Sequence, residues 1–186
     1  MPTFIAETGA ALVNATSLAS VAFATDYLSV HPKGSVWSAL ADDATRETHL
    51  MRATRKMQRD YAGMWQGDVV SLNQALDHPR FGMYNANGVY IDSATVADAI
   101  AQACCELALA SAIAASATET DLDPELENSG SVKRERFKVD VIETETEWTI
   151  GAEADQIVRP RVDRLLAPFF KAGAVSSGGS SRASRA

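Results

Sequence analysis

Histidine and cysteine are the side chains in this sequence best suited to catalysis, and they are few. His31, His49 and His78 stand far apart and form neither an HxH nor an HExxH arrangement. The GxSxG, GxxxxGK and GxGxxG loops that hold nucleophiles or phosphates are absent. A Cys–His pair could still assemble from Cys104 with His49 or His78, but Cys104 and Cys105 lie in an apolar helical segment, where cysteine is more often a small buried hydrophobe. The sequence therefore predicts a protein that is not an enzyme and has no cofactor.

Carboxylates, the other common metal ligands, are concentrated in the segment TETDLDPELENSG, which starts at residue 118. The segment has five acidic residues and no basic one, so we expect a solvated connection. It lacks the glycine and the final glutamate at the offsets that an EF-hand uses. We therefore predict no metal site.

Basic side chains are concentrated in two places, the first of which is a predicted helix in the segment DDATRETHLMRATRKMQRDYAGM. Asp42 or Asp43 is the expected N-cap, and apolar residues follow at helical spacing from Leu50. Five basic residues cover the remaining surface: Arg46, Arg52, Arg55, Lys56 and Arg59. Two interpretations stay open, a solvated face with i,i+4 ion pairs or a site for nucleic acid or a partner.

The second basic segment is half of a predicted β-hairpin, SVKRERFKVDVIETETEW. With a turn at residues 139–140, Arg136 would face Glu143 and Arg134 would face Glu145 across the two strands. One strand is then basic and the other acidic. Either the hairpin is solvated on a monomer, or copies of the chain pair edge to edge, which closes into a ring if the rotation allows it.

These segments predict a mainly α fold: a small helical bundle with an inserted charged β-hairpin, a C-terminal helix and a flexible tail. A short helix follows Ser20, and a long Ala-rich helix covers residues 94–117. Between the helices, His78-Pro79 and a tight turn at Asn87-Gly88, between FGMY and VYI, predict a small hairpin or an ordered, turn-rich loop. We divide the chain into a bundle with an N-terminal arm (1–117), the acidic loop and hairpin (118–156), and the C-terminal helix with a basic tail (157–186).

Overall charge and hydropathy narrow the class of protein further. The net charge of -7 opposes a main role in coating nucleic acid, so any DNA contact would be local or weak. The one long apolar run carries Asp98, Gln102 and Glu106 in one polar stripe, which predicts a buried amphipathic helix and no membrane span. We see no signal peptide, and the adjacent cysteines favour a reducing cytoplasm.

The order of six segments resembles the head-to-tail connector, or adaptor, family of tailed bacteriophages, often labelled DnaT-like single-stranded DNA-binding proteins. The segments are NATSLASVAFATDYL, WSALADDATRETHLMRATRKMQRDY, QALDHPRFGMYNANGVYID, AIAQACCELAL, SVKRERFKV and VDRLLAPFF. The sequence departs from the family pattern at Asp77-His78, where Ala-Trp is usual, and at Thr95-Val96, where Ile-Pro is common. These departures leave the fold prediction unchanged but predict different local packing.

The resemblance implies a structural virion protein in the neck between capsid and tail, assembled in the host cytoplasm. It would form a ring, typically of twelve copies, that binds the portal and a stopper or tail-completion protein and extends the channel for genomic double-stranded DNA. The subunit interface would then be the hairpin: Lys133, Arg134, Arg136, Phe137, Glu143, Glu145, Glu147 and Trp148. Docking on the portal would use Arg159, Arg161, Arg164, Leu165, Phe169, Phe170, Arg182 and Arg185. The alternative is a replication protein that holds single-stranded DNA through VKRERFK and the basic helix.

Overall fold

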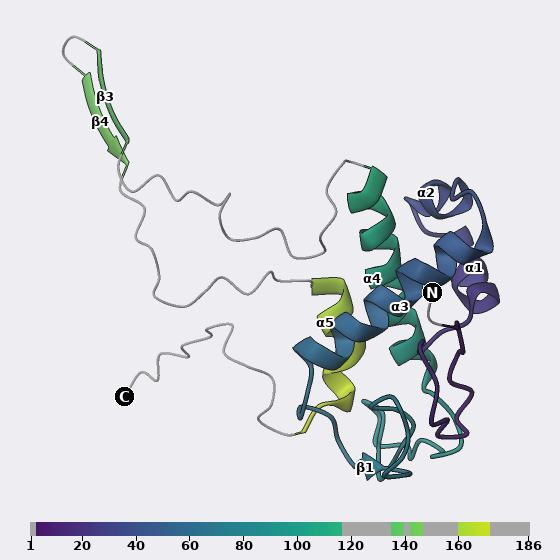
Figure 1. The fold of residues 1–186 in the computed structure, drawn as a ribbon. Helices are drawn as coiled ribbons and strands as arrows, with labels where there is room; N and C mark the ends of the chain where they lie inside the picture. Colours follow the sequence, from purple (N-terminus) through teal and green to yellow (C-terminus); the bar gives the residue numbers. More distant parts are fainter. Residues whose placement is uncertain (1–2, 117–134, 140–141, 147–159, 172–186) are drawn as a thin grey trace, which may run out of the picture.

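A computed structural model describes residues 3–116, 135–139, 142–146 and 160–171. Five α-helices lie within these residues, and the mainly α fold with a small two-stranded hairpin is confirmed. The core helix α4 (Asp98–Ser116) is crossed by α3 (Asp43–Asp60), with α1 (Val21–Ser29) and α2 (Gly34–Ser38) at one side and α5 (Pro160–Leu166) at the other (Figure 1). The predicted segment boundaries, at residues 117 and 157, lie outside the described part of the chain.

The first two helices are short and are joined by a tight turn. The Ser20 hydroxyl accepts the Phe23 N–H at 3.2 Å, which confirms the predicted cap of α1. The sequence did not predict α2, because five residues show no helical period. The side chain of Trp37, in α2, is only 1% exposed. Gly34, also in α2, lies so close to α1 that a Cβ at this position would be 2.1 Å from the Leu28 carbonyl oxygen. Tertiary packing therefore holds this short helix in place.

Helix α3 begins and packs as the sequence predicts. The Asp42 carboxylate accepts the Thr45 N–H at 2.8 Å. Hydrogen bonds from Thr45, first from its side chain and then from its N–H, lower the pKa of Asp42. The side chains of Leu50, Ala53 and Met57 are fully buried against α4 and its neighbours. The opposite face of α3 is left for polar residues.

Helix α4 begins four residues later than predicted. The Asp92 side chain accepts the Ala94 N–H, and the Asp92 carbonyl accepts the Thr95 N–H and hydroxyl, so residues 92–95 form a turn instead of a first helical turn. By length and composition α4 could cross a membrane, but more than half of its most apolar window is buried inside the protein, as in a core helix. The prediction of a buried, Ala-rich central helix is confirmed.

The turn-rich loop between α3 and α4 is compact. It contains the small antiparallel pair β1 (Asp68–Val69) and β2 (Arg80–Phe81), which the sequence did not predict. Asp77 and His78, the first pair of residues that depart from the family pattern, both contact Trp65: its indole N–H donates to Asp77 Oδ2 at 3.2 Å, and its ring packs edge-on against the ring of His78. Burial and the nearby Arg80 lower the pKa of His78 to about 3, so the imidazole is neutral.

The charged hairpin forms from β3 (Glu135–Val139) and β4 (Ile142–Thr146), but in a different register from the predicted one. Arg136 pairs with Glu145 and Lys138 with Glu143, and the last pair of the ladder is Val139 with Ile142, so each partner lies two residues later than predicted. Successive side chains of a strand alternate between its faces, so a shift of two residues keeps the faces unchanged and still sets basic positions opposite acidic ones.

The C-terminal helix contributes to the same core as α3 and α4. Helix α5 continues into the 3-10 turn η2 (Ala167–Phe169), which contains Pro168 in its first positions. Phe170 lies against the rings of Tyr61 and Trp65, and the Tyr61 hydroxyl donates to Asp163 Oδ1 at 2.8 Å. These contacts join the C-terminal end of α3 to α5 and to the residue after η2.

Candidate nucleic-acid interface

The exposed face of α3 carries a stripe of three arginines, Arg52, Arg55 and Arg59. They are spaced three and four residues apart, so they lie on one side of the helix, opposite the buried Leu50, Ala53 and Met57. All three are exposed. We call these three residues the arginine stripe.

The other two basic residues of α3 have different environments. The Arg46 guanidinium binds the Asp43 carboxylate at 2.7 Å and the carbonyl oxygen of Leu40 at 3.0 Å. Lys56 is 5% exposed and pairs with Asp60 at 2.8 Å. These two residues therefore match the interpretation of a helix face with local ion pairs.

Arg52 and Arg55 do not match that interpretation. The residues three and four positions away from either of them include no Asp or Glu, and within the described residues neither has a carboxylate partner. Their helical neighbours are instead each other, Lys56 and Arg59, and like charges at these spacings destabilise a helix slightly. The pKa of the buried His49 is lowered first by burial and then by the charge of Arg52. A bound anion would reduce the electrostatic repulsion among these basic side chains.

The loop that follows α3 exposes aromatic rings. Phe81, Tyr84 and Tyr90 each present about half of their surface to solvent, and Tyr84 and Tyr90 face each other across an antiparallel bridge. Figure 1 shows this loop, with β1, below α3 at the bottom of the view. The Gln58 side chain of α3 donates to the Ala75 carbonyl in the loop at 3.2 Å. Sequence reasoning did not single out these rings, although the Asn-Gly turn between two aromatic residues was a usable signal.

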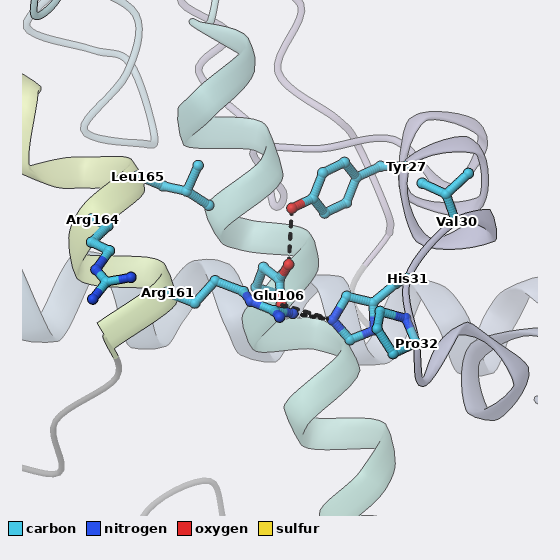
Figure 2. Close-up of a pocket in the computed structure, with 8 residues that line it drawn as sticks. All are labelled: Tyr27, Val30, His31, Pro32, Glu106, Arg161, Arg164 and Leu165. Atoms are coloured by element: carbon cyan, nitrogen blue, oxygen red, sulfur yellow. Dashed lines mark hydrogen bonds and ion pairs between the residues drawn. The ribbon is translucent and has the colours of Figure 1, made fainter.

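A separate pocket, of about 650 Å³, lies between α1, α4 and α5 (Figure 2). At its base the Glu106 carboxylate, 9% exposed, accepts the Tyr27 hydroxyl on Oε1 at 2.8 Å. Its Oε2 lies 3.5 Å from His31 Nε2 and 3.4 Å from Arg161 Nη1. The lining residues are Tyr27, Val30, His31, Pro32, Glu106, Arg161, Arg164 and Leu165. Both oxygens of Glu106 are thus engaged by side chains of the protein.

This network ties three elements of the bundle together. Burial, and the hydrogen bond and charge of Glu106, raise the pKa of Tyr27 to about 12, so the hydroxyl remains a donor at neutral pH. The partners of Glu106 are Tyr27 of α1, His31 of the turn after α1, and Arg161 of α5, which is far from the other two in the sequence. The polar stripe predicted for α4 therefore includes a structural anchor at Glu106, which the sequence did not reveal.

The structure also locates the residues predicted to dock on a portal. Phe169 and Phe170 are core side chains, 5% and 7% exposed, so their prediction as a docking surface is wrong; aromatic packing against Trp65 and Tyr61 buries them. Arg161 and Arg164 are exposed, and Leu165 is half-buried. Arg159, Arg182 and Arg185 lie outside the described residues.

The residues predicted for the subunit interface lie in and around the charged hairpin. Arg136 and Phe137 stand on β3, and Glu143 and Glu145 stand on β4. Lys133, Arg134, Glu147 and Trp148 lie outside the described residues. The hairpin as a subunit interface stays a prediction.

Comparison with known proteins bears on the function. A sequence model for a family described as DnaT-like ssDNA binding proteins matches residues 2–186, nearly the whole chain. Comparisons with curated proteins and with solved structures find no match.

This match corrects the function inferred from the resemblance. It points to single-stranded DNA binding, the alternative above, and overturns the prediction of a bacteriophage head-tail connector, that is, a portal-binding adaptor ring around a DNA channel. No finding tests the predicted partners, the location, or the absence of catalysis, metal and cofactor. These stay predictions.

Proposed function

Because the chain belongs to the family of DnaT-like ssDNA binding proteins, we propose that it binds single-stranded DNA through the arginine stripe of α3. The observation that carries this proposal is the exposure of Arg52 and Arg55 without carboxylate partners in the described part of the chain. A guanidinium binds phosphate oxygens with two parallel hydrogen bonds, and these contacts need no particular base.

The dimensions of the stripe suit a short length of strand. From Arg52 to Arg59 is seven residues, or about 10 Å along the helix axis. At roughly 3.4 Å per stacked nucleotide, that length spans about three nucleotides. The stripe would therefore act as one local contact region.

The overall charge sets the expected strength of binding. A protein of formal net charge -7 repels DNA at long range, so binding depends on the arginine stripe. Salt screens the attraction between these arginines and the phosphates. We expect moderate affinity that falls steeply as salt rises.

The test is fluorescence anisotropy of a labelled 20-nucleotide oligothymidine, titrated with the full chain at several salt concentrations. In the double variant Arg52→Ala/Arg55→Ala, the slope of log K against log salt should fall in magnitude by about 1.4, because each phosphate contact on a single strand contributes about 0.7. The control Lys33→Ala/Arg164→Ala removes the same charge from exposed sites on other elements. Equal loss in both variants would mean that net charge, and not the stripe, governs binding.

A third variant separates the two basic segments of the chain. Lys133→Ala/Arg134→Ala/Arg136→Ala removes three of the four basic residues of the hairpin segment and leaves Lys138. If this variant abolishes binding while Arg52→Ala/Arg55→Ala leaves it unchanged, the assignment to α3 is refuted. No binding by the wild-type chain at 50 mM salt would refute the proposed function itself.

A further inference from the structure

Exposed hydrophobic side chains are concentrated in the loop between α3 and α4. Eight large hydrophobic residues of the described chain are exposed, and six of them fall between residues 70 and 90. The six are Val70, Leu72, Phe81, Tyr84, Val89 and Tyr90. Exposed apolar surface that is clustered in this way marks a binding surface more often than scattered residues do.

The backbone beneath two of these rings is well ordered by hydrogen bonds. Tyr84 and Tyr90 pair across a bridge with ring centroids 5.8 Å apart at 71°. The connecting turn has Gly88 at φ +74°, and the Asn85 side chain accepts the Asn87 and Val89 N–H groups at 2.9 and 3.0 Å. The rings are therefore held in position before any ligand binds, which lowers the entropy cost of binding.

The same element is anchored to the protein core. Met83, 2% exposed, precedes Tyr84, and its carbonyl accepts the Ile91 N–H at 3.0 Å. The Gln66 side chain accepts the Tyr84 N–H at 3.2 Å and donates to the Phe170 carbonyl at 3.1 Å. A rigid element that exposes aromatic rings is poorly explained by folding alone.

Beside Phe81 the Arg80 guanidinium holds the chain in place. It donates to the carbonyl oxygens of Gln66 at 2.8 Å and Gly67 at 2.7 Å, so β2 is tied to the segment before β1. Arg80 is thus occupied with backbone groups and serves to position Phe81.

We propose that Phe81, Tyr84 and Tyr90 form a platform on which unpaired bases of the bound strand stack. This inference rests on the proposed function and explains how the protein would distinguish single strands from duplex, since phosphate contacts alone occur with both. Every base has a π-face, so stacking on aromatic side chains tolerates any sequence. The protein would therefore prefer single-stranded DNA without reading a particular sequence.

The neighbouring charges favour bases over phosphates at this platform. Asp68 pairs with Phe81 in the β1–β2 register, and Asp92 follows Tyr90 by two residues. Both carboxylates are exposed and repel phosphate groups. The strand would turn its bases toward the rings and its backbone away from them.

The experiment compares three labelled DNA probes of equal length with the full-length chain: oligothymidine, the same backbone with abasic sites throughout, and a duplex. We expect the wild type to bind oligothymidine at least about 5-fold more tightly than the abasic strand or the duplex. Tyr84→Ala should lose roughly 5- to 150-fold on oligothymidine and change little on the abasic strand. Tyr84→Phe keeps the ring and should bind as the wild type does.

A matched control comes from the same loop. Leu72, 97% exposed, is aliphatic, so Leu72→Ala should leave binding to all three probes unchanged. If Leu72→Ala weakens oligothymidine binding as much as Tyr84→Ala, or if the wild type binds abasic and normal strands equally, the stacking platform is refuted and the patch serves another partner. Failure of every probe to bind the wild type refutes the proposed function, and the platform with it. The far-UV circular dichroism of Tyr84→Ala should match that of Tyr84→Phe.

Discussion

Replacing Tyr27 with phenylalanine tests whether the carboxylate of Glu106 stabilises the packing of α1 on α4. The Tyr27 hydroxyl donates to Glu106 Oε1 at 2.8 Å, and the carboxylate is only 9% exposed. A hydrogen bond to a charged group contributes about 1.5–3 kcal/mol to stability. Because the pocket is open to water and Oε2 keeps His31 and Arg161 beside it, we expect the lower end, about 1.5 kcal/mol.

Urea denaturation followed by circular dichroism measures this change. With an m-value of about 2 kcal/mol/M, a loss of 1.5 kcal/mol lowers the urea midpoint by about 0.75 M. The matched control is Tyr84→Phe, which removes an exposed hydroxyl and should change stability by less than about 0.5 kcal/mol. Equal midpoints for the two variants would refute the anchoring role of Glu106.

The pH dependence provides a second readout of the same bond. The folded-state pKa of Tyr27 is raised from 10.0 to about 12, so folding favours the protonated phenol. The stability that this hydroxyl contributes is fully present below pH 10 and is lost as the pH rises through 12. The difference in stability between wild type and Tyr27→Phe should therefore shrink across that interval, and a constant difference would contradict the assignment.

Two further predictions concern the loop and the core. Gly63 and Gly67 both have positive φ, so replacing either with alanine should cost about 1 kcal/mol of stability. Gly67→Ala should cost more than Gly63→Ala, because a Cβ at Gly67 would lie 2.0 Å from the Phe81 carbonyl oxygen, whereas a Cβ at Gly63 would meet no atom within 4 Å. Urea denaturation compares the two, and equal losses would contradict the close approach of β1 and β2. Burial raises the pKa of Cys104 to about 11 and also raises that of Cys105, so neither free thiol should react with DTNB at pH 8 until urea unfolds the chain; rapid labelling of the native protein would contradict their burial.

Local features of the fold could be predicted from the sequence, because they depend on residues a few positions apart. Ser20 and Asp42 cap α1 and α3 as predicted, since an N-cap bonds to a backbone N–H three residues later. The 3.6-residue spacing of Leu50, Ala53 and Met57 identified the buried face of α3. The charged hairpin was also predictable in kind, and only its register was missed.

The candidate site could be predicted only in part. The sequence located five basic residues on α3, but it could not separate Arg52 and Arg55, which stay exposed, from Arg46 and Lys56, which bind neighbouring groups. That separation depends on which part of the helix surface other elements cover.

What the sequence by itself determined is therefore a helical protein with capped helices, a basic helix face and a charged hairpin. Only the tertiary structure decided that Phe169 and Phe170 are core residues, that Glu106 anchors α1 and α5, and that Tyr84 and Tyr90 remain exposed. The physical reason is that capping and helical periodicity act over one or two turns of chain, whereas the exposure of a side chain depends on contacts between segments that are distant in the sequence.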